Sequence, residues 1–256
     1  MDCDNTPAEY LDRVYNTDCI AGMSRLPDGC VDMILCDLPY GITACRWDSI
    51  IPFDALWDQY LRVIKDNGAI VLTGCQPFTT RLIQSNPKLF RYCWYWRKNM
   101  VTGFANANRQ PLKCVEDVCV FYRRLPTYNP QGLIHRSAPK LSRGRKAVSP
   151  GDSTYRADGS LSHDTYSHVT NYPRQMLEFK CERGLHPTQK PVALFEYLIR
   201  TYTNPGETVL DNCMGSGTTA VACLRSGRHY VGYEIDERYY QTTTKRIEEE
   251  RCRLSR

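Results

Sequence analysis

Residues 210–222 read LDNCMGSGTTAVA, a pattern typical of a buried strand, a tight glycine turn and the first turns of a helix. Gly215 and Gly217 let the backbone approach a ligand closely, and a helix N-terminus after such a turn suits a nucleotide-like group. About twenty residues after Gly215, Glu234 ends the next expected strand, Tyr230–Glu234, where a carboxylate suits a ribose diol. This order of strand, turn, helix, strand and acid predicts a cofactor site.

Two nucleotide sites fit this stretch less well. The chain has no G-x-x-x-x-G-K-[ST] sequence, which excludes a P-loop. The third glycine of the dinucleotide fingerprint is also missing, because Thr218, Thr219 and Ala220 follow Gly217. Alanine can replace that glycine, so a dinucleotide stays open, but no phosphate-binding charge lies nearby. The pattern therefore favours a cofactor without a pyrophosphate.

The rest of the chain alternates short apolar runs with helix-like segments. VDMILCDL (31–38) predicts a buried strand that ends at Pro39, and FDALWDQYLRVIKDNG (53–68) predicts an amphipathic helix. Further strands are expected at 69–74, 92–96, 118–122, 207–213 and 230–234, and further helices after Pro77, at 192–202, at 218–227 and from about residue 236. This alternation predicts an α/β fold, a three-layer α/β/α sandwich with a mostly parallel sheet.

In such sheets, ligands bind beyond the carboxyl ends of the strands. Two motifs lie at strand ends of this kind: Asp37-Leu38-Pro39-Tyr40, and the glycine turn that follows Asp211. On its own the first motif is as well explained by a strand that ends in a proline turn with Tyr40 packed. Together the two motifs predict one shared pocket.

Composition separates one quarter of the chain from the rest. Residues 123–185 hold 11 Lys and Arg against 5 Asp and Glu, so they carry a charge of +6, while the whole chain carries +5. They are rich in Pro, Gly, Ser, Arg and Tyr and show little periodicity, which predicts an irregular insertion in an otherwise single domain spanning 1–256. A basic segment beside a near-neutral body suits a polyanion, although a solvated loop with incidental charge explains it too.

Several classes of protein fit poorly. No stretch approaches the ~18–20 uninterrupted apolar residues of a membrane span, and the polar N-terminal segment does not read as a secretory signal. The 13 cysteines are scattered, several within apolar runs, and no pair has C-x-x-C spacing. We therefore expect reduced, mostly structural thiols in a cytoplasmic protein, and no metal site.

Four segments, taken together, resemble one enzyme family. DLPY (37–40) is similar to the catalytic signature [DNS]-P-P-[YFW], and DNCMGSGTT (211–219) to the cofactor motif D-P-F-x-G-S-G-T-T, of the DNA amino-methyltransferases that modify N6 of adenine or N4 of cytosine. HPTQKP (186–191) resembles the T-x-K-P segment of that family, and WYWRKN (94–99) with Glu116 fits the pattern between them. Their order resembles the permuted group in which the catalytic half comes first.

This resemblance implies a site-specific DNA methyltransferase that uses S-adenosylmethionine and extrudes the target base from the duplex. The implied catalytic residues are Asp37, Leu38, Pro39 and Tyr40. The Asp37 carboxylate and the Leu38 carbonyl would accept the two hydrogens of the target amine, whose lone pair then points at the methyl group, while Tyr40 stacks on the extruded base. The Asp form of the motif favours adenine N6. Leu38 replaces a proline that contributes only its carbonyl.

The resemblance also implies a set of cofactor contacts. Asp18 would face the cofactor adenine, and an N-cap for the helix that begins at Cys19 is an equally good and compatible reading. Asp211 would face the methionine amino group, with Thr188 and Lys190 near the methionine end, although Lys190 also reads as a surface lysine before a helix. Asn212 and Cys213 replace the Pro-Phe of the motif, so no phenylalanine would pack on the cofactor. The predicted cofactor residues are Asp18, Cys19, Asp37, Thr188, Lys190, Asp211, Cys213, Gly215, Ser216, Gly217, Thr218 and Glu234.

In this family the segment between the two halves recognises the target, so residues 123–185 are expected to contact double-stranded DNA. Its predicted DNA-binding residues are Arg136, Lys140, Arg143, Arg145 and Lys146. These side chains can neutralise phosphates or read guanine edges. The sequence leaves open the recognition sequence, a homodimer, and a cognate endonuclease of a restriction-modification system.

Three alternatives remain. An N4-cytosine methyltransferase would share the fold, although Ser is more usual than Asp at position 37 in that subclass. RNA or protein-amide methyltransferases more often carry Asn there, and a protein acceptor leaves the basic insertion unexplained. A catalytically silent DNA-binding homologue is opposed by the intact Asp37, Tyr40 and glycine turn.

Overall fold

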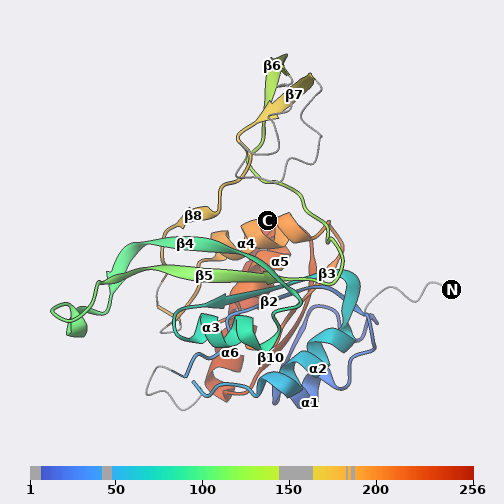
Figure 1. The fold of residues 1–256 in the computed structure, drawn as a ribbon. Helices are drawn as coiled ribbons and strands as arrows, with labels where there is room; N and C mark the ends of the chain where they lie inside the picture. The colour runs from blue at the N-terminus through green and yellow to red at the C-terminus, as the bar shows by residue number, and fades with distance from the viewer. Residues whose placement is uncertain (1–6, 42–47, 144–163, 183, 186–187) are drawn as a thin grey trace. The chain divides into compact units, whose positions relative to one another are not determined.

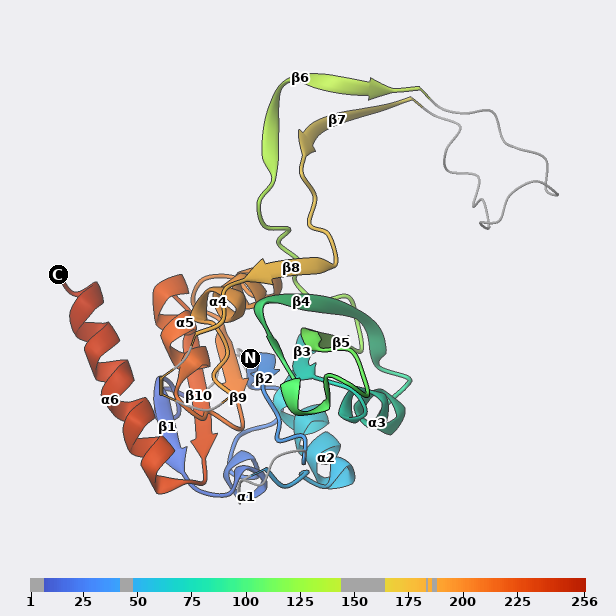
Figure 2. The same ribbon diagram turned by 90° about the vertical axis from the view of Figure 1, so that its left-hand side faces the viewer.

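The computed structural model describes residues 7–41, 48–143, 164–182, 184–185 and 188–256, and these residues divide into two compact units. The first unit combines 1–129 with 175–256, and the second is 130–174. Figures 1 and 2 show the first unit as a twisted sheet with helices packed against it. No helix among the described residues is long and apolar enough to cross a membrane.

The first unit is built on an eight-stranded sheet in the order β1-β10-β9-β2-β3-β5-β4-β8. Five of its seven strand pairings are parallel, and only those of β5 with β3 and with β4 are antiparallel. Its strands are β1 Arg13–Asn16, β2 Val31–Cys36, β3 Ile64–Gly74, β4 Phe90–Thr102, β5 Lys113–Phe121, β8 Met176–Phe179, β9 Thr208–Asp211 and β10 His229–Glu234.

The central strands are apolar on both sides, so both faces of the sheet must be shielded from water, and helices cover them. Along β2, Ile34 and Cys36 join one core while Met33 and Leu35 join the other. The helices α1 Cys19–Met23, α2 Phe53–Val63 and α3 Phe78–Ser85 pack into the first core, and α4 Val192–Tyr202, α5 Thr218–Ser226 and α6 Glu237–Leu254 into the second. The predicted three-layer α/β/α sandwich with a mostly parallel sheet is confirmed.

The predicted helix over 53–68 ends early. α2 stops at Val63, and Ile64 already has an extended backbone with ψ of 138°. Between the pairings Val31↔Ile64 and Met33↔Ala69, β3 has a bulge. The Lys65 ammonium pairs with the Asp32 carboxylate at 2.7 Å across it. Gly68 is not a helix end but lies in this bulge, where a Cβ would come within 2.8 Å of the Asp32 carbonyl oxygen.

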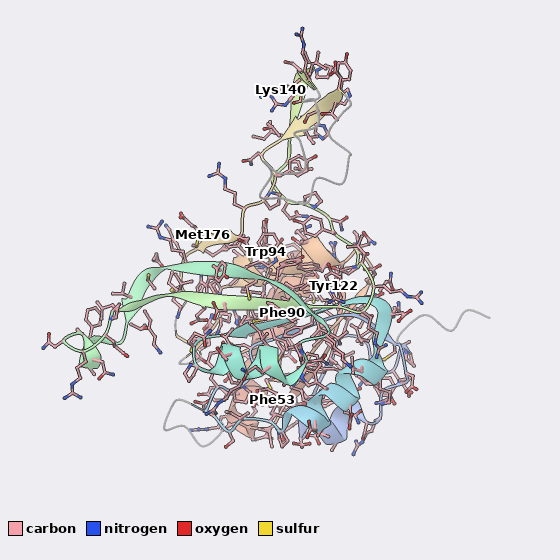
Figure 3. All side chains as sticks on the ribbon, viewed as in Figure 1. Phe53, Phe90, Trp94, Tyr122, Lys140 and Met176 are labelled. Carbon is pink, nitrogen blue, oxygen red and sulfur yellow. The ribbon has the colours of Figure 1, made fainter. Side chains whose placement is uncertain are left out.

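The stretch expected to be irregular contains three strands. β8 joins the edge of the large sheet, where it pairs in parallel with β4. β6 Ile134–Ser142 and β7 Thr165–Thr170 form a separate antiparallel ribbon, which makes up the regular part of the second unit. Every residue of β6 is exposed, including Lys140, which Figure 3 labels. Among the described residues of the second unit, none is buried.

Candidate active site

A cavity of about 740 Å³ lies at the carboxyl ends of the parallel strands of the first unit. β2 ends at Cys36 and places Asp37 in the cavity, and β9 ends at Asp211. β10 ends at Glu234, which also lines it. Parallel strands that run side by side end at the same edge of a sheet, so motifs more than 170 residues apart in sequence meet here.

Most of the residues predicted for the site line this cavity. They are Asp18, Cys19, Asp37, Leu38, Pro39, Tyr40, Thr188, Lys190, Asp211, Cys213, Gly215, Ser216, Thr218 and Glu234. Gly217 does not line it. This glycine is the N-cap of α5 with φ of 80°, and a Cβ there would meet Thr243 Cγ2 at 3.0 Å, so its absent side chain serves the packing of α6 on the turn.

The predicted DNA-binding residues that the structure describes belong to the second unit. Arg136 and Lys140 are on β6, and Arg143 follows its last residue; all three are exposed. Arg145 and Lys146 lie outside the described residues, as do His186 and Pro187 of the HPTQKP segment.

Three hydrogen bonds hold the Asp37 carboxylate. The Tyr40 hydroxyl donates to Asp37 Oδ1 at 2.6 Å, and the Thr73 hydroxyl donates to the same oxygen. The Lys190 ammonium donates to Asp37 Oδ2 at 2.5 Å. Burial, together with the Asp37 and Glu116 charges, raises the pKa of Tyr40 well above its usual value, so the phenol keeps the proton it donates. Donors therefore hold this carboxylate in one orientation.

Lys190 belongs to a chain of four alternating charges. Its ammonium also lies 3.3 Å from Glu116 Oε2, and the other oxygen of Glu116 pairs with the Lys98 ammonium. Burial lowers the pKa of Lys190, but the Asp37 and Glu116 carboxylates outweigh that effect, so the pKa is raised overall. We call Asp37, Lys190, Glu116 and Lys98 the charge quartet. It places the Lys190 ammonium on the Asp37 carboxylate, in the cavity that the other predicted cofactor residues also line.

Sequence reasoning missed two members of this network. Thr73, the buried residue next to the end of β3, and Lys98 on β4 had no assigned role. Thr73 carried one signal, a polar side chain at the end of the apolar run AIVLTG (69–74), where parallel strands present ligand-binding groups. Lys98 carried none, because its pairing with Glu116 depends on how β4 and β5 are aligned.

The structure gives Tyr40 a role beside the predicted stacking. Its hydroxyl is committed to Asp37, and its ring packs against Phe78 with centroids 4.9 Å apart. The Lys190 ammonium lies 5.6 Å from the centroid of the same ring. Tyr40 is therefore part of the frame that holds Asp37, whatever it does to the target base.

At the other end of the cavity, two carboxylates organise the glycine turn. Glu234 Oε2 accepts the Gly215 backbone N–H at 2.7 Å, and Asp211 Oδ1 accepts that of Cys213 at 3.0 Å. Burial raises the pKa of Asp211 to about 6 and also raises that of Glu234. Two buried carboxylates beside a glycine turn suit a ligand that brings both a cation and hydroxyl groups.

Asp18 and the two positions where the cofactor motif departs from the family have defined surroundings. Asp18 is the N-cap of α1, because its carboxylate accepts the Ala21 backbone N–H at 3.0 Å, and it lines the cavity as well. Both readings of Asp18 are therefore compatible in the structure. Where the motif departs from the family, the buried Asn212 accepts a hydrogen bond from the Tyr60 hydroxyl at 2.5 Å, while Cys213 faces the cavity.

Comparisons with known proteins bear on this geometry. A family model described as DNA methylase, for N6 and N4 methyltransferases, matches residues 31–245, which is most of the chain. The chain belongs to this DNA methylase family. The resemblance inferred from the four motifs is confirmed, and with it methyl transfer to DNA as the class of reaction and S-adenosylmethionine as the cofactor of the family.

Individual relatives agree with the family. The putative methylase YubD of Escherichia coli (strain K12) is 47% identical over 242 residues, which span 93% of this chain and 90% of YubD. The M1.HpyAVI–SAM complex is 24% identical with a TM-score of 0.61, over 92% of this chain and 98% of that one. The cytosine-N4-specific PvuII DNA methyltransferase is 15% identical with a TM-score of 0.62, over 94% of this chain and 91% of the PvuII chain. The two structures share the fold, and the fold alone does not choose the acceptor base.

Proposed function

We propose that this DNA methylase transfers a methyl group from S-adenosylmethionine to N6 of adenine, within a specific sequence of duplex DNA, after the base is extruded into the cavity. The observation that carries the proposal is the cavity itself, which brings the Asp37 carboxylate and the glycine turn into one enclosure. The Asp form of the motif at Asp37 supports adenine rather than cytosine as the acceptor.

The residues around the turn fit the cofactor. The Asp211 carboxylate would bind the α-ammonium group and Glu234 the ribose hydroxyls, with Gly215 allowing close approach of the backbone. Asp18 would face the adenine ring. S-adenosylmethionine, when bound, supplies a methyl group on a sulfonium, which is already a strong electrophile. The protein then contributes mainly position.

Asp37 would position the acceptor. An exocyclic amine is a weak nucleophile because its lone pair is delocalised into the ring. The Asp37 carboxylate and the Leu38 carbonyl would each accept one amine hydrogen, which favours a pyramidal nitrogen with its lone pair free. For this the carboxylate must stay oriented, and the Lys190 ammonium on Oδ2 and the Tyr40 hydroxyl on Oδ1 support that role. The target amine would share or displace one of these donors.

The rest of the charge quartet would keep Lys190 in place. Glu116 offsets the desolvation of the Lys190 ammonium, and Lys98 offsets the second negative charge, so the four groups are neutral together. Without Glu116, Lys190 would have Asp37 as its only carboxylate partner among the described residues and would compete harder with the target amine. Lys190 is therefore a positioning residue in this proposal.

Methyl transfer to mixed duplex DNA tests the proposal. The protein is incubated with S-adenosylmethionine carrying a tritiated methyl group, and the DNA is digested to nucleosides and separated. We expect label in N6-methyldeoxyadenosine, and at least about a hundredfold less with Asp37→Asn, which keeps the shape but loses the charge. Calorimetric titration should show that Asp37→Asn still binds the cofactor.

Two results would contradict the proposal in different ways. Label in N4-methyldeoxycytidine would show the wrong acceptor base, while the site and its chemistry would stand. No label in DNA, with the cofactor bound normally, would show a catalytically silent DNA-binding homologue. Sequencing of the methylated DNA from the same reaction gives the recognition sequence.

A further inference from the structure

The hairpin formed by β4 and β5 is bent near its outer end. Between the pairings Arg97↔Val115 and Thr102↔Lys113, β4 uses five steps where β5 uses two, so β4 contains a large bulge. Bulges bend a strand and redirect the chain beyond them. The ten residues of the connection, 103–112, begin with a 3-10 turn, Phe104–Asn106. Figure 1 shows this end of the hairpin, which we call the hairpin tip (residues 102–113), extending past the helices of the first unit.

The hairpin tip is ordered but contributes nothing to the core. Its backbone folds on itself, with the Asn106 N–H donating to the Gly103 carbonyl and the Gln110 N–H to the Asn106 carbonyl, both at 3.0 Å. Every residue from Val101 to Pro111 is exposed, and the Phe104 side chain is 67% exposed. A large aromatic ring held on a defined turn in water gains stability only from a partner outside the chain.

The same tip lines the cavity. Thr102, Gly103, Asn106, Gln110 and Lys113 belong to the wall that also contains Asp37. A base that enters this cavity therefore passes beside the hairpin tip. Whatever remains of the duplex after the base has left must lie close to the tip as well.

The chemistry of the tip suits nucleic acid. Between Val101 and Val115 the chain has Arg109 and Lys113 and no acidic residue, so a phosphate backbone meets no repulsion there. Asn106 and Gln110 carry amides, which pair with base edges. An exposed phenylalanine can enter the gap between stacked bases, as apolar wedges do in other DNA-binding proteins.

We infer that the hairpin tip enters the duplex at the target site and that Phe104 fills the position in the base stack that the extruded base leaves. The inference rests on the proposed function, because it assumes that a base is extruded from duplex DNA into the Asp37 cavity. It adds an element outside the basic segment 123–185 to the DNA-contacting surface. Filling the gap would recover stacking that extrusion loses.

The test compares Phe104→Ala with Leu254→Ala. Leu254 is a matched control because it is in the first unit but outside the 123–185 segment, is 47% exposed and does not line the cavity. On a duplex with the mapped recognition sequence, Phe104→Ala should lower kcat/KM for methyl transfer about tenfold or more, and Phe104→Trp should retain most of it. Leu254→Ala should stay within about twofold of the unaltered protein.

A second duplex distinguishes a wedge from an ordinary contact. When the base opposite the target is replaced by an abasic site, extrusion costs less. The loss caused by Phe104→Ala should then shrink to about threefold or less. An equal loss on both duplexes, or a Phe104→Ala rate that matches Leu254→Ala, would overturn the inference.

The failure of the inference can be told from failure of the proposed function. If the unaltered protein transfers no methyl group, the proposed function fails, and the hairpin tip is tested by fluorescence anisotropy with labelled mixed-sequence duplex DNA. Phe104→Ala should then bind at least about tenfold more weakly than Leu254→Ala. Equal affinities would refute the contact.

Discussion

At the scale of single residues, the buried Asp211 carboxylate predicts a pH dependence for cofactor binding, because we propose that it binds the cofactor ammonium. Burial raises the pKa of Asp211 to about 6, although the hydrogen bonds from the Thr219 hydroxyl and the Cys213 N–H act to lower it. The protonated form is therefore favoured in the free protein below that pH. A ligand ammonium needs the ionised form, so binding competes with a proton.

We accordingly predict that the affinity for S-adenosylmethionine falls as the pH decreases through about 6. At pH 5 about a tenth of Asp211 is ionised, so Kd measured by calorimetry should rise about tenfold between pH 7 and pH 5. Burial also raises the pKa of Glu234. Asp211→Asn separates the two: it should bind weakly at every pH, and a full pH dependence in this variant would contradict the assignment.

Lys190 holds the Asp37 carboxylate in place. In Lys190→Met the carboxylates of Asp37 and Glu116 lose the cation between them, and Asp37 loses the donor on Oδ2 that orients it. The single-turnover rate at pH 7 should fall at least about tenfold, while Lys190→Arg retains more activity.

Lys65→Met is the control for this experiment. Lys65 also pairs with a carboxylate, that of Asp32, but outside the cavity. This variant should stay within about twofold of the single-turnover rate of the unaltered protein. If Lys190→Met were as fast as Lys65→Met, Lys190 would not position Asp37.

At the scale of secondary-structure elements, β4 is attached to α4 by buried hydroxyl groups. The Trp94 indole N–H donates to the Tyr202 hydroxyl at 2.7 Å, and the Tyr92 and Tyr202 hydroxyls lie 2.8 Å apart. Figure 3 shows Trp94 in the packed body of the first unit. Because Pro191 and Lys190 immediately precede α4, this attachment also fixes the segment that carries the quartet's central cation.

Tyr202→Phe should therefore destabilise the protein by about 1–3 kcal/mol, because it leaves the buried Trp94 N–H without its acceptor. Urea unfolding followed by circular dichroism measures the change. Tyr95→Phe, at an exposed position on the same strand, should change the free energy of unfolding by less than about 0.5 kcal/mol. Equal effects of the two substitutions would refute the role of this network.

The elements were predictable where local sequence decides them. β2, β9 and β10 follow from short β-branched runs, and the turn at Gly215 from glycines that alone tolerate its backbone. The boundary between α2 and β3 could not be predicted, because the pattern of apolar residues continues through Ile64. Its position depends on two contacts with a distant segment: the Lys65–Asp32 ion pair and the close approach of Gly68 to the Asp32 carbonyl oxygen.

The site divides in the same manner. Asp37, Asp211 and Glu234 were predictable because each ends a strand, and strand ends in such sheets hold ligands. Three contacts of the site could not be predicted: Lys190 with Asp37, Thr73 with Asp37, and Lys98 with Glu116. Each joins residues that only the folded sheet brings together. The sequence of the hairpin tip shows no periodicity. Its place beside the cavity depends on the bend that the bulge introduces into β4.

At the scale of the whole molecule, the second unit depends on something outside itself. A two-stranded ribbon without a buried residue is marginal in water, and the described part of this unit, β6 and β7, has none. Its exposed face carries Arg136, Lys140 and Arg143. We propose that duplex DNA is the partner this unit contacts, as the 123–185 segment of the family implies.

Replacing Arg136, Lys140 and Arg143 by Ala should weaken DNA binding and flatten its salt dependence, by about 0.9 in the slope of log K against log salt for each phosphate that the protein no longer neutralises. Cofactor affinity should not change. Removing three exposed cations near α6, Arg238, Lys245 and Arg256, is the control for net charge. If both triple variants lose affinity equally, the second unit does not contact DNA specifically.

The most direct measurement is the distance between the Asp37 carboxylate and the transferable methyl carbon in a crystal structure of the protein with S-adenosylmethionine. With the cofactor on Asp211 and Glu234, we predict a separation of about 6 Å or less, which leaves room for one amine nitrogen between the two groups. A separation beyond ~10 Å, with no closure that shortens it, would contradict direct transfer in this cavity.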